Sequence, residues 1–303
     1  MSQRISIRVP ATSANLGCLF DCAALALSLH LDIHLTPRSD GVVAVRYRGV
    51  NPERVAEDCN NLVAHTIQDT LHQWGKTRGF DLEIDNQIPI GVGLGSSAAA
   101  IVGSLAACHW LADTTLFDEE LISLATQLEG HPDNVAAAWH GGFTVALQQE
   151  ERVLAYSCPV PDWLKLVLVI PDYAVPTEAA RGVLPAHYSR ADAIHNLQRA
   201  VALAAHLFSG KADICRSFFD DRWHQPHRAA LVPGLAEVLA YCHPELLGIC
   251  LSGSGPSILA LVRGAAEEIG EAIRSILAQH NIQSQPRVLA ADNLGAKGWS
   301  LPA

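Results

Sequence analysis

The sequence has no uninterrupted apolar run of membrane-spanning length, although 49% of its 303 residues are hydrophobic. A helix that crosses a bilayer needs about 20 consecutive apolar residues, so we expect no membrane partner. The chain begins Met1-Ser2-Gln3-Arg4 and continues into alternating apolar and polar residues, unlike the apolar block of a signal peptide. These absences lead us to expect a cytoplasmic protein.

Basic residues are also few. The chain carries 21 Lys and Arg residues against 31 Asp and Glu residues, and its formal net charge is −10 at pH 7. A chain with this excess of negative charge is poorly suited to the phosphate backbone of a nucleic acid, so we expect no nucleic-acid partner.

Cysteine pairs with the spacing of a metal site or a redox motif are missing. None of the eight cysteines forms a CxxC pair, and we expect free thiols. The sequence also lacks internal repeats, low-complexity blocks and long linkers. Its length favours two domains, which we assign to residues 1–158 and 159–303.

A glycine-rich stretch is the most informative feature that is present. Gly91, Gly93 and Gly95 stand between a strand-like segment at 82–84 and an apolar, proline-free segment at 97–112 that is typical of a buried helix. Glycines let the backbone turn sharply and lie against a ligand. The N–H groups at the helix start, the helix dipole and two adjacent serines together predict an anion site, most simply for phosphate.

Two common phosphate-binding loops do not match this stretch. It lacks the lysine of GxxxxGK[ST], and GxGxxG would need a glycine where Ser96 stands. The glycines alone leave open a tight connection without a ligand. The full string from Pro89 to Ala99 resembles the ATP-binding loop of the GHMP small-molecule kinases, the family of galactokinase, homoserine kinase, mevalonate kinase and phosphomevalonate kinase. The resemblance implies these ATP-binding residues: Asn61, Pro89, Gly91, Gly93, Leu94, Gly95, Ser96, Ser97 and Ala98.

Hydrophobic periodicity predicts strands and helices in the first half of the chain. Asn61 caps one of these helices or, by the resemblance, lines the adenine pocket, and the two roles are compatible. The predicted strands are 4–9, which ends at Pro10, then 25–35, 41–49, 82–84 and 143–147. The predicted helices are 97–112, 118–128 and 61–76, the last with Leu62, Ile67, Leu71 and Trp74 facing inward.

The segment between the first two predicted strands, Val9 to Gly17, is small and polar, as a turn would be. With Asp21 it also resembles the first GHMP motif in the form that homoserine kinases carry. Asn15 and Asp21 keep their places in that motif, whereas Cys18-Leu19 replaces a Pro-Gly pair.

The run Glu129-Gly130-His131-Pro132-Asp133-Asn134 follows the predicted helix 118–128. Such a run is a plausible helix break and N-cap. It also concentrates carboxylate, imidazole and amide groups, and it resembles a homoserine kinase signature. In that pattern Asn134 stands where many GHMP kinases carry an aspartate base. Asp133 either acts as a base or caps the helix.

The second half predicts a ferredoxin-like βαββαβ order with extra helices in the first crossover. The predicted strands are 164–170, 246–251, 257–262 and 286–291, and the predicted helices are 177–184, 189–208, 211–223, 234–242 and 265–280. The glycine-rich segment 251–257 is a hairpin connection that also matches the third GHMP motif. We therefore expect an α+β, two-domain GHMP kinase fold whose N-terminal domain is mixed β/α.

The resemblance implies transfer of the ATP γ-phosphoryl group to a small alcohol, which depends on positioning and charge neutralisation. Ser97 and Glu129 are the candidate ligands of Mg²⁺, a hard ion that prefers oxygen. Some homoserine kinases carry the metal carboxylate further upstream, where this chain has Ser123.

Two arginines, Arg181 and Arg228, stand in contexts similar to those of homoserine kinases, and a guanidinium group suits an amino-acid carboxylate. Asp21 would then pair with the substrate ammonium, and Asn15 and His131 would orient its polar groups. The implied catalytic residues are Asn134, His131, Arg181 and Arg228, and the implied substrate-binding residues are Asn15, Asp21, His131, Arg181 and Arg228.

The resemblance therefore implies the homoserine kinase branch of the family, with ATP and L-homoserine as the expected partners and O-phospho-L-homoserine, made for threonine biosynthesis, as the expected product. One alternative is a GHMP kinase for another alcohol, such as a sugar, a mevalonate-like compound or another hydroxy acid. A second alternative is a catalytically silent binding protein with this fold. A homodimer is one possible assembly.

Overall fold

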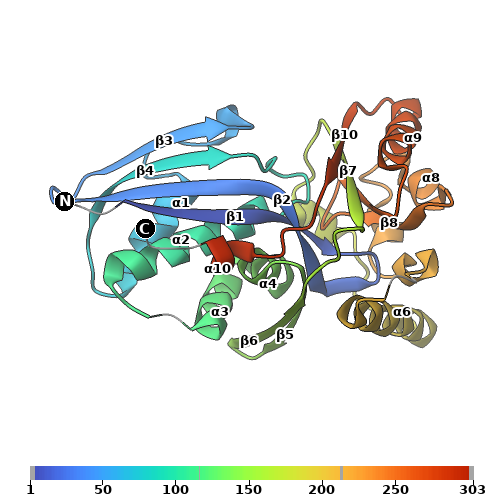
Figure 1. Ribbon diagram of the computed structural model, residues 1–303, viewed down its shortest axis with the longest axis horizontal. Helices are drawn as coiled ribbons and strands as arrows, with labels where there is room; N and C mark the ends of the chain where they lie inside the picture. The colour runs from blue at the N-terminus through green and yellow to red at the C-terminus, as the bar shows by residue number, and fades with distance from the viewer. Residues whose placement is uncertain (1–3, 116, 212–213, 300–303) are drawn as a thin grey trace.

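Two β-sheets occupy the two ends of the molecule in the computed structural model, which describes residues 4–115, 117–211 and 214–299 (Figure 1). The first sheet has the order β3-β4-β2-β5-β6, with β1 paired to β2. Its strands are β1 (Ile5–Asn15), β2 (Leu19–Arg38), β3 (Val43–Gly49), β4 (Gly79–Asn86), β5 (Phe143–Gln149) and β6 (Arg152–Cys158). Within the described chain, no helix is both long and apolar enough to cross a membrane.

Helices cover one face of the first sheet, as Figure 1 shows. They are α1 (Leu62–Gln73), α2 (Ser96–Ala112), α3 (Asp118–Glu129) and α4 (Pro132–His140), with the short 3-10 helix η1 (Pro52–Arg54) after β3. The six alternating apolar residues of β2, from Leu25 to Leu35, are all buried, as the sequence predicts. Helix α2 lies so close to the sheet that a Cβ at Gly103 would be 2.5 Å from Ile33 Cδ1.

Two predictions for this part of the chain are wrong, and one strand was not predicted. Strand β1 does not end at Pro10 but continues to Asn15, because a register shift between Pro10 and Ala11 accommodates the proline in the pairing with β2. Leu62 is exposed, because it is the first residue of α1 and lies outside its apolar face. Strand β6 was not expected from its sequence, since most of its residues are partly or fully exposed.

The second sheet is antiparallel and has the order β10-β7-β9-β8. Its strands are β7 (Lys165–Pro171), β8 (Leu246–Leu251), β9 (Ile258–Val262) and β10 (Ser284–Leu289). The first crossover carries α5 (Thr177–Gly182), α6 (Arg190–Ser209), η2 (Arg216–Phe219), α7 (Gln225–Arg228) and α8 (Leu235–Ala240), and the second carries α9 (Ala266–Gln279). The predicted ferredoxin-like order with extra helices is confirmed.

The helix predicted at 211–223 is wrong for its described part, in which only η2 is helical; residues 212–213 lie outside the described residues. The carboxylate of Asp221 accepts hydrogen bonds from the N–H groups of Trp223, His224 and Gln225, at 2.8, 3.0 and 2.7 Å. This aspartate thereby organises a turn into α7, because its side chain offers backbone N–H groups an alternative to a continuous helix.

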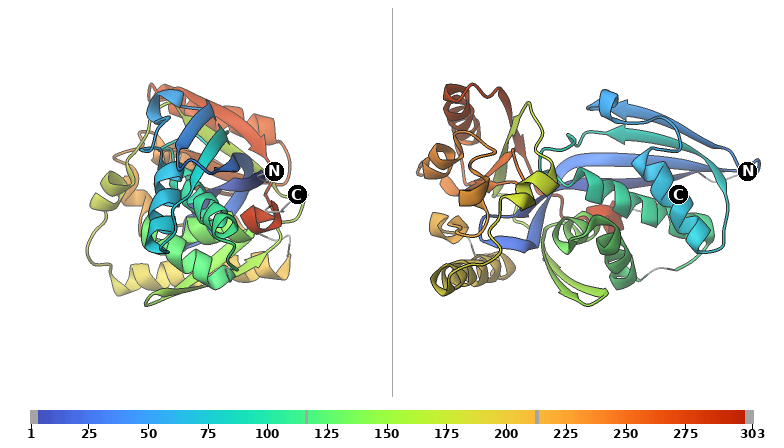
Figure 2. Two further views of the ribbon diagram at one scale, coloured as in Figure 1. Left: turned by 90° about the vertical axis from the view of Figure 1, so that its left-hand side faces the viewer. Right: turned by 180° about the vertical axis from the view of Figure 1, so that it is seen from behind.

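The chain crosses between the two sheets more than once. The tip of the β1–β2 hairpin extends from the first sheet to the helices of the second, as the front and rear views show (Figures 1 and 2). Residues 290–299, including α10 (Gly295–Trp299), return from β10 to pack on α4 and β1. The hairpin tip meets the start of α7, where the carbonyl of Gly17 accepts a hydrogen bond from His224, and residues 290–299 meet β2 at Ala26 and Ser28.

Candidate functional site

The glycine-rich segment 89–97, between β4 and the start of α2, is called the phosphate loop. A cleft of about 250 Å³ lies where the phosphate loop, the tip of the β1–β2 hairpin and the helices α4, α5 and α7 meet. It is lined by 13 of the residues that the sequence predicts for the site: Asn15, Asp21, Gly91, Gly93, Leu94, Gly95, Ser96, Ser97, Glu129, His131, Asn134, Arg181 and Arg228. The cleft also includes Gly253 and Ser254 from the β8–β9 connection, which matches the expected third motif.

Three predicted ATP-binding residues lie outside the lining of this cleft. Asn61 caps α1, accepting hydrogen bonds from the N–H groups of Val63 and Ala64 at 3.0 and 3.4 Å. Pro89 lines an adjoining cavity of about 380 Å³, and Ala98 is buried in α2. Their roles toward a nucleotide stay predictions.

The glycines of the phosphate loop are required by their surroundings. Gly93 and Gly95 have φ angles of 79° and 64°, which side chains disfavour. A Cβ at Gly93 would lie 2.1 Å from the carbonyl oxygen of Ser252, and one at Gly95 would lie 2.0 Å from Thr12 Oγ1. The loop is therefore pressed against β1 on one side and the β8–β9 connection on the other.

The loop turns its carbonyl groups toward the protein. The carbonyl oxygen of Gly93 accepts from Ser252 Oγ at 2.7 Å, and that of Leu94 accepts from the N–H of Thr12 at 3.1 Å. In the described part of the chain, the N–H groups from Gly93 to Ser97 make no hydrogen bond to protein. Free N–H groups at the start of a helix suit an anion.

Asn134 and Asp133 lie at the start of α4, below this loop. Asn134 accepts a hydrogen bond from Thr12 Oγ1 at 2.7 Å. Oδ1 of Asp133 accepts from the Asn134 N–H at 2.7 Å and contacts Nδ1 of His131 at 3.1 Å. Burial would lower the pKa of His131, but the hydrogen bond and charge of Asp133, with a smaller effect of Glu129, raise it. His131 thus carries positive charge more readily than an ordinary histidine.

Ser97 and Glu129 both line the cleft, and their side chains are within hydrogen-bonding distance of each other. Burial raises the pKa of Glu129, and a hydrogen bond from the Ser97 side chain partly offsets that rise. Ser123, which stands at the alternative position for a metal carboxylate, accepts a hydrogen bond from the N–H of Val153 at 2.9 Å. No cluster of three or more His, Cys, Asp or Glu side chains suited to a metal occurs among the described residues.

Asp21 and Arg181 form an ion pair across the cleft. Both guanidinium Nη atoms of Arg181 donate to the two carboxylate oxygens of Asp21, at 2.9 and 2.8 Å. The side-chain hydrogen bond to Asp21 raises the pKa of Arg181 more than burial lowers it. The two residues that the sequence assigned to opposite ends of a substrate are therefore paired with each other.

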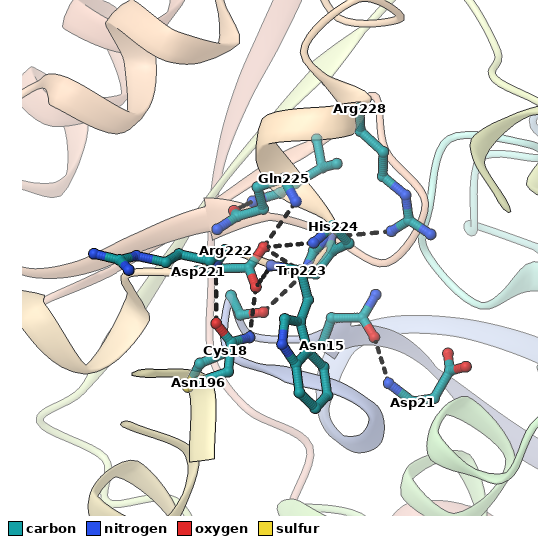
Figure 3. Close-up of polar contacts among 12 residues, drawn as sticks. Asn15, Cys18, Asp21, Asn196, Asp221, Arg222, Trp223, His224, Gln225 and Arg228 are labelled. Carbon is teal, nitrogen blue, oxygen red and sulfur yellow. Dashed lines mark hydrogen bonds and ion pairs between the residues drawn. The ribbon is translucent and has the colours of Figure 1, made fainter. Parts of the chain in front are cut away.

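Arg228 is almost fully buried, with 2% of its surface exposed. Its Nε donates to the carbonyl of Ala180 at 3.1 Å, and its Nη1 donates to the carbonyl of Gly253 at 2.9 Å. Nη1 also donates to Nδ1 of His224 at 3.1 Å (Figure 3). Burial, and secondarily the charge of Arg181, lower the pKa of Arg228 to about 10. An anionic ligand in the cleft would offset that cost of burial.

Sequence reasoning assigned no role to Phe20 or His224. The ring centroid of Phe20 lies 5.6 Å from the guanidinium carbon of Arg181 and 5.5 Å from that of Arg228. His224 is fully buried, and its Nε2 donates to the carbonyl of Gly17 at 2.7 Å. Two local signals could have been used: Phe20 directly precedes Asp21, and His224 stands four residues before Arg228. Nothing local to His224 indicated that it would contact Gly17.

Comparisons with known proteins agree with this geometry. The GHMP kinases N terminal domain model matches residues 61–142, and the GHMP kinases C terminal model matches residues 195–279. The chain is 38% identical to a homoserine kinase of Desulfitobacterium hafniense, covering 96% of this chain and 99% of that protein. It is 37% identical to a homoserine kinase of Persephonella marina, covering 96% and 97%.

Solved structures are similar over the same length. The crystal structure of a homoserine kinase from Cytophaga hutchinsonii has a TM-score of 0.85 and 28% identity, covering 97% of each chain. A mevalonate diphosphate decarboxylase from Staphylococcus aureus has a TM-score of 0.68 and 16% identity, which shows a shared fold alone.

Proposed function

The chain belongs to the GHMP kinase family, and from that premise we propose that it is a homoserine kinase. It transfers the γ-phosphoryl group of ATP to the hydroxyl of L-homoserine and releases O-phospho-L-homoserine, a precursor of threonine. The observation that carries this proposal is the presence of a phosphate loop and two arginines, Arg181 and Arg228, in one cleft. The phosphate loop suits the phosphates of the donor, and the neighbouring arginines suit the carboxylate of an amino-acid acceptor.

The phosphate loop binds the ATP phosphates through its free N–H groups and the hydroxyls of Ser96 and Ser97. Hydrogen bonds from Ser252 and Thr12 fix the carbonyl groups of Gly93 and Leu94 on the protein side of the loop. The N–H groups therefore keep their direction and need not reorganise when a phosphate binds. Phosphoryl transfer needs little covalent help from the protein, so this alignment provides much of the rate.

Magnesium fits the donor set beside the loop. Ser97 and Glu129 would hold it, because their oxygen atoms are close and Mg²⁺ prefers oxygen ligands, with phosphate and water completing its shell. When bound, the ion neutralises negative charge on the phosphates. The half-buried carboxylate of Glu129, whose pKa is raised without a cation, gains a counter-charge in that arrangement.

The acceptor amino acid lies between the arginines and the start of α4. Arg181 and Arg228 bind its carboxylate, Asp21 binds its ammonium group, and Asn15 and His131 line the remaining space. Asn134, which is held by Thr12, helps to direct the hydroxyl toward the phosphate loop. Asp133 makes short contacts to His131 and to the Asn134 N–H, and these contacts favour a role in positioning over one as a base.

The test is ATP-dependent turnover of the purified protein on L-homoserine, 3-aminopropanol, mevalonate and galactose. We expect kcat/KM for L-homoserine to exceed the others by about 100-fold or more, because a site built for charged groups rejects analogues that lack them. Equal turnover of another alcohol, or no nucleotide-dependent turnover, would contradict the proposal.

A homodimer and a cytoplasmic location stay predictions. Exposed Ile194, Leu197 and Val201, which are 48%, 62% and 61% exposed, lie on one face of α6 and are the natural place to test assembly. Sedimentation of the protein with Leu197→Glu would show whether that face holds two copies together.

A further inference from the structure

A second cavity, of about 530 Å³, lies in the second half of the chain between η2, α7, α8 and β8. It is larger than the cleft, and it shares no lining residue with the cleft. Apolar side chains make up much of its wall, among them Phe219, Leu235, Leu239 and Ile249. A hollow of this size with mainly apolar walls is typical of sites that bind small organic molecules.

Arg216 supplies the positive charge in the lining of this cavity. Its guanidinium donates to the carbonyl of Leu239 and to the sulfur of Cys242, and neither partner is a carboxylate. Its Nε makes no hydrogen bond to any residue that the structure describes. The guanidinium is therefore held in place without being neutralised, and such a group suits a carboxylate ligand.

The two aspartates of the lining already have partners. Asp220 contacts Nε2 of His195 at 3.3 Å and Nη2 of Arg199 at 3.6 Å. Asp221 accepts a hydrogen bond from Nδ2 of Asn196 at 2.7 Å, besides those from the three backbone N–H groups of the turn into α7 (Figure 3). Because both negative charges are satisfied by protein groups, the arginine decides which charge the cavity prefers in a ligand.

Gln225 offers a hydrogen-bond donor to the same cavity. This residue lines the cavity and is 2% exposed, and its Oε1 accepts from the N–H of Leu251 at 2.8 Å. That bond fixes the amide with its oxygen toward β8, and within the described chain its Nε2 has no hydrogen-bond partner. A buried donor without a partner is costly, so a ligand oxygen in the cavity would be stabilised there.

Helix α7 contributes to both the cavity and the cleft. Pro226 and Ala229 line the cavity, whereas Arg228 from the same turn lines the cleft. The N–H of Gln225 donates to Asp221 at 2.7 Å, and the carbonyl of Gln225 accepts from the N–H of Ala229 at 3.1 Å. A ligand that bonds to Gln225 therefore acts on the residue that begins this helix.

We propose that the cavity is a binding site for a small monocarboxylate with a hydrocarbon body, and that its occupant stabilises α7. The carboxylate pairs with Arg216 and accepts from Nε2 of Gln225. The hydrocarbon packs against the apolar wall, where Phe219 and Ile249 lie. One negative charge matches one guanidinium, whereas a phosphate dianion would bring more charge than the cavity offsets. The site does not depend on the proposed function.

Isothermal titration calorimetry with 3-phenylpropanoate tests the site without any turnover. For the wild-type protein we expect a Kd of about 0.1–1 mM, as is usual for a ligand of this size. 3-Phenylpropanol, which has a hydroxyl group in place of the carboxylate, should bind about 10-fold more weakly because it cannot form an ion pair with Arg216. Equal binding of the two compounds would overturn the proposal, and this comparison does not depend on the folding of a variant.

Two pairs of variants locate the binding. Arg216→Gln should weaken binding of 3-phenylpropanoate by about 10-fold. Arg222→Gln is its control and should stay within about twofold of wild type, because Arg222 forms an exposed ion pair with Asp192 outside the cavity lining. Ala236→Trp should abolish binding by filling the cavity, whereas Ala240→Trp on the same helix, outside the lining, should not. Undiminished binding in Ala236→Trp would place the ligand elsewhere and contradict the proposal.

Hydrogen exchange measures the effect on α7. At a 3-phenylpropanoate concentration near the wild-type Kd, the backbone amides of residues 225–229 should exchange about twofold more slowly, while those of the phosphate loop stay unchanged. Unchanged exchange in α7, or equal slowing in Arg216→Gln at the same concentration, would show that no occupant of this cavity stabilises the helix. Since none of these measurements uses turnover, failure of the proposed kinase activity would leave their results as they are.

Discussion

Phe20 illustrates how one uncharged side chain sets the position of two cations. The guanidinium carbons of Arg181 and Arg228 both lie within 5.6 Å of its ring centroid. The two positive charges repel each other, and the charge of Arg181 helps to lower the pKa of Arg228. The negative face of an aromatic ring offsets part of that repulsion without supplying a competing anion. The ring is therefore suited to keeping two guanidinium groups near one carboxylate.

We expect Phe20→Leu to raise KM for homoserine by about 5- to 30-fold, because losing two cation–π contacts costs about 1–2 kcal/mol and each 1.4 kcal/mol is tenfold. Phe20→Tyr keeps the ring and should stay within about threefold of wild type. Steady-state kinetics on homoserine and ATP would measure both. A similar KM in the Leu and Tyr variants would show that the ring face contributes nothing.

Glu129 tests the metal site at the same scale. We expect Glu129→Gln to lower kcat by roughly 100-fold, because a neutral amide is a poor ligand for a hard dication, while the melting temperature stays the same or rises. The rise would follow from removing a half-buried carboxylate whose pKa is already raised by desolvation. Turnover across a magnesium titration checks this, and near-normal kcat at saturating magnesium would exclude Glu129 from the site.

At the scale of elements, the phosphate loop depends on contact with the β8–β9 connection. Gly93→Ala should destabilise the fold by about 2–3 kcal/mol, because the new Cβ meets the Ser252 carbonyl and the φ is positive. Gly75→Ala is a matched control, since Gly75 has a φ of 69° but open space around it, so only about 1 kcal/mol of backbone strain is expected.

Denaturant unfolding and KM for ATP distinguish the two variants. Only Gly93→Ala should weaken ATP use, because only that glycine belongs to the phosphate loop. Equal destabilisation by the two substitutions would mean that the loop can move away from Ser252 at no cost.

The elements show how far the sequence alone can lead. Hydrophobic alternation predicted β2, because burial on one face leaves a period in the residues. The first strand of the second sheet, β7, was predicted instead from its short apolar run, because it is buried along nearly its whole length. The hydrophobic pattern could not give the course of β1 beyond Pro10, because a bulge in the pairing decides whether a strand tolerates proline. Nor could it give the turn at Asp221, where side-chain hydrogen bonds override helical periodicity.

In the candidate site, too, the features that depend on local sequence could be predicted, and those that depend on contacts between distant segments could not. Residues in contiguous motifs, such as Gly93 and Glu129, could be predicted because their chemistry is local to the motif. The contact of His224 with Gly17 could not, because the two residues are 207 positions apart in the sequence. The pairing of Asp21 with Arg181 was hidden for the same reason.

At the scale of the whole molecule, the buried side chain of His224 makes the free energy of unfolding depend on pH. Burial lowers the pKa of His224 to about 4, so the folded protein keeps this imidazole neutral between about pH 6.5 and 4. The unfolded chain binds the proton in that window, so stability must fall as the pH is lowered through it. The neutral ring accepts from Arg228 and donates to Gly17, which ties the cleft to the hairpin tip.

We expect the wild-type protein to lose more stability than His224→Gln between pH 7 and pH 5, because the amide has the donor and acceptor of the ring but does not titrate. Urea midpoints at the two pH values measure the difference, and the other histidines cancel because both proteins contain them. An equal loss in the two proteins would show that His224 does not titrate differently on folding.

The return of residues 290–299 to the first sheet bears on synthesis of the chain. The N–H of Asp292 bonds the carbonyl of Ala26, and the carbonyl of Asp292 accepts from the N–H of Gly142, so this segment bridges two early parts of the first domain. A ribosome makes the segment only after every strand of the second sheet. During synthesis, part of the surface of β2 and α4 therefore stays uncovered until the second domain has emerged from the ribosome. We expect chaperones to bind the nascent chain mainly in that interval.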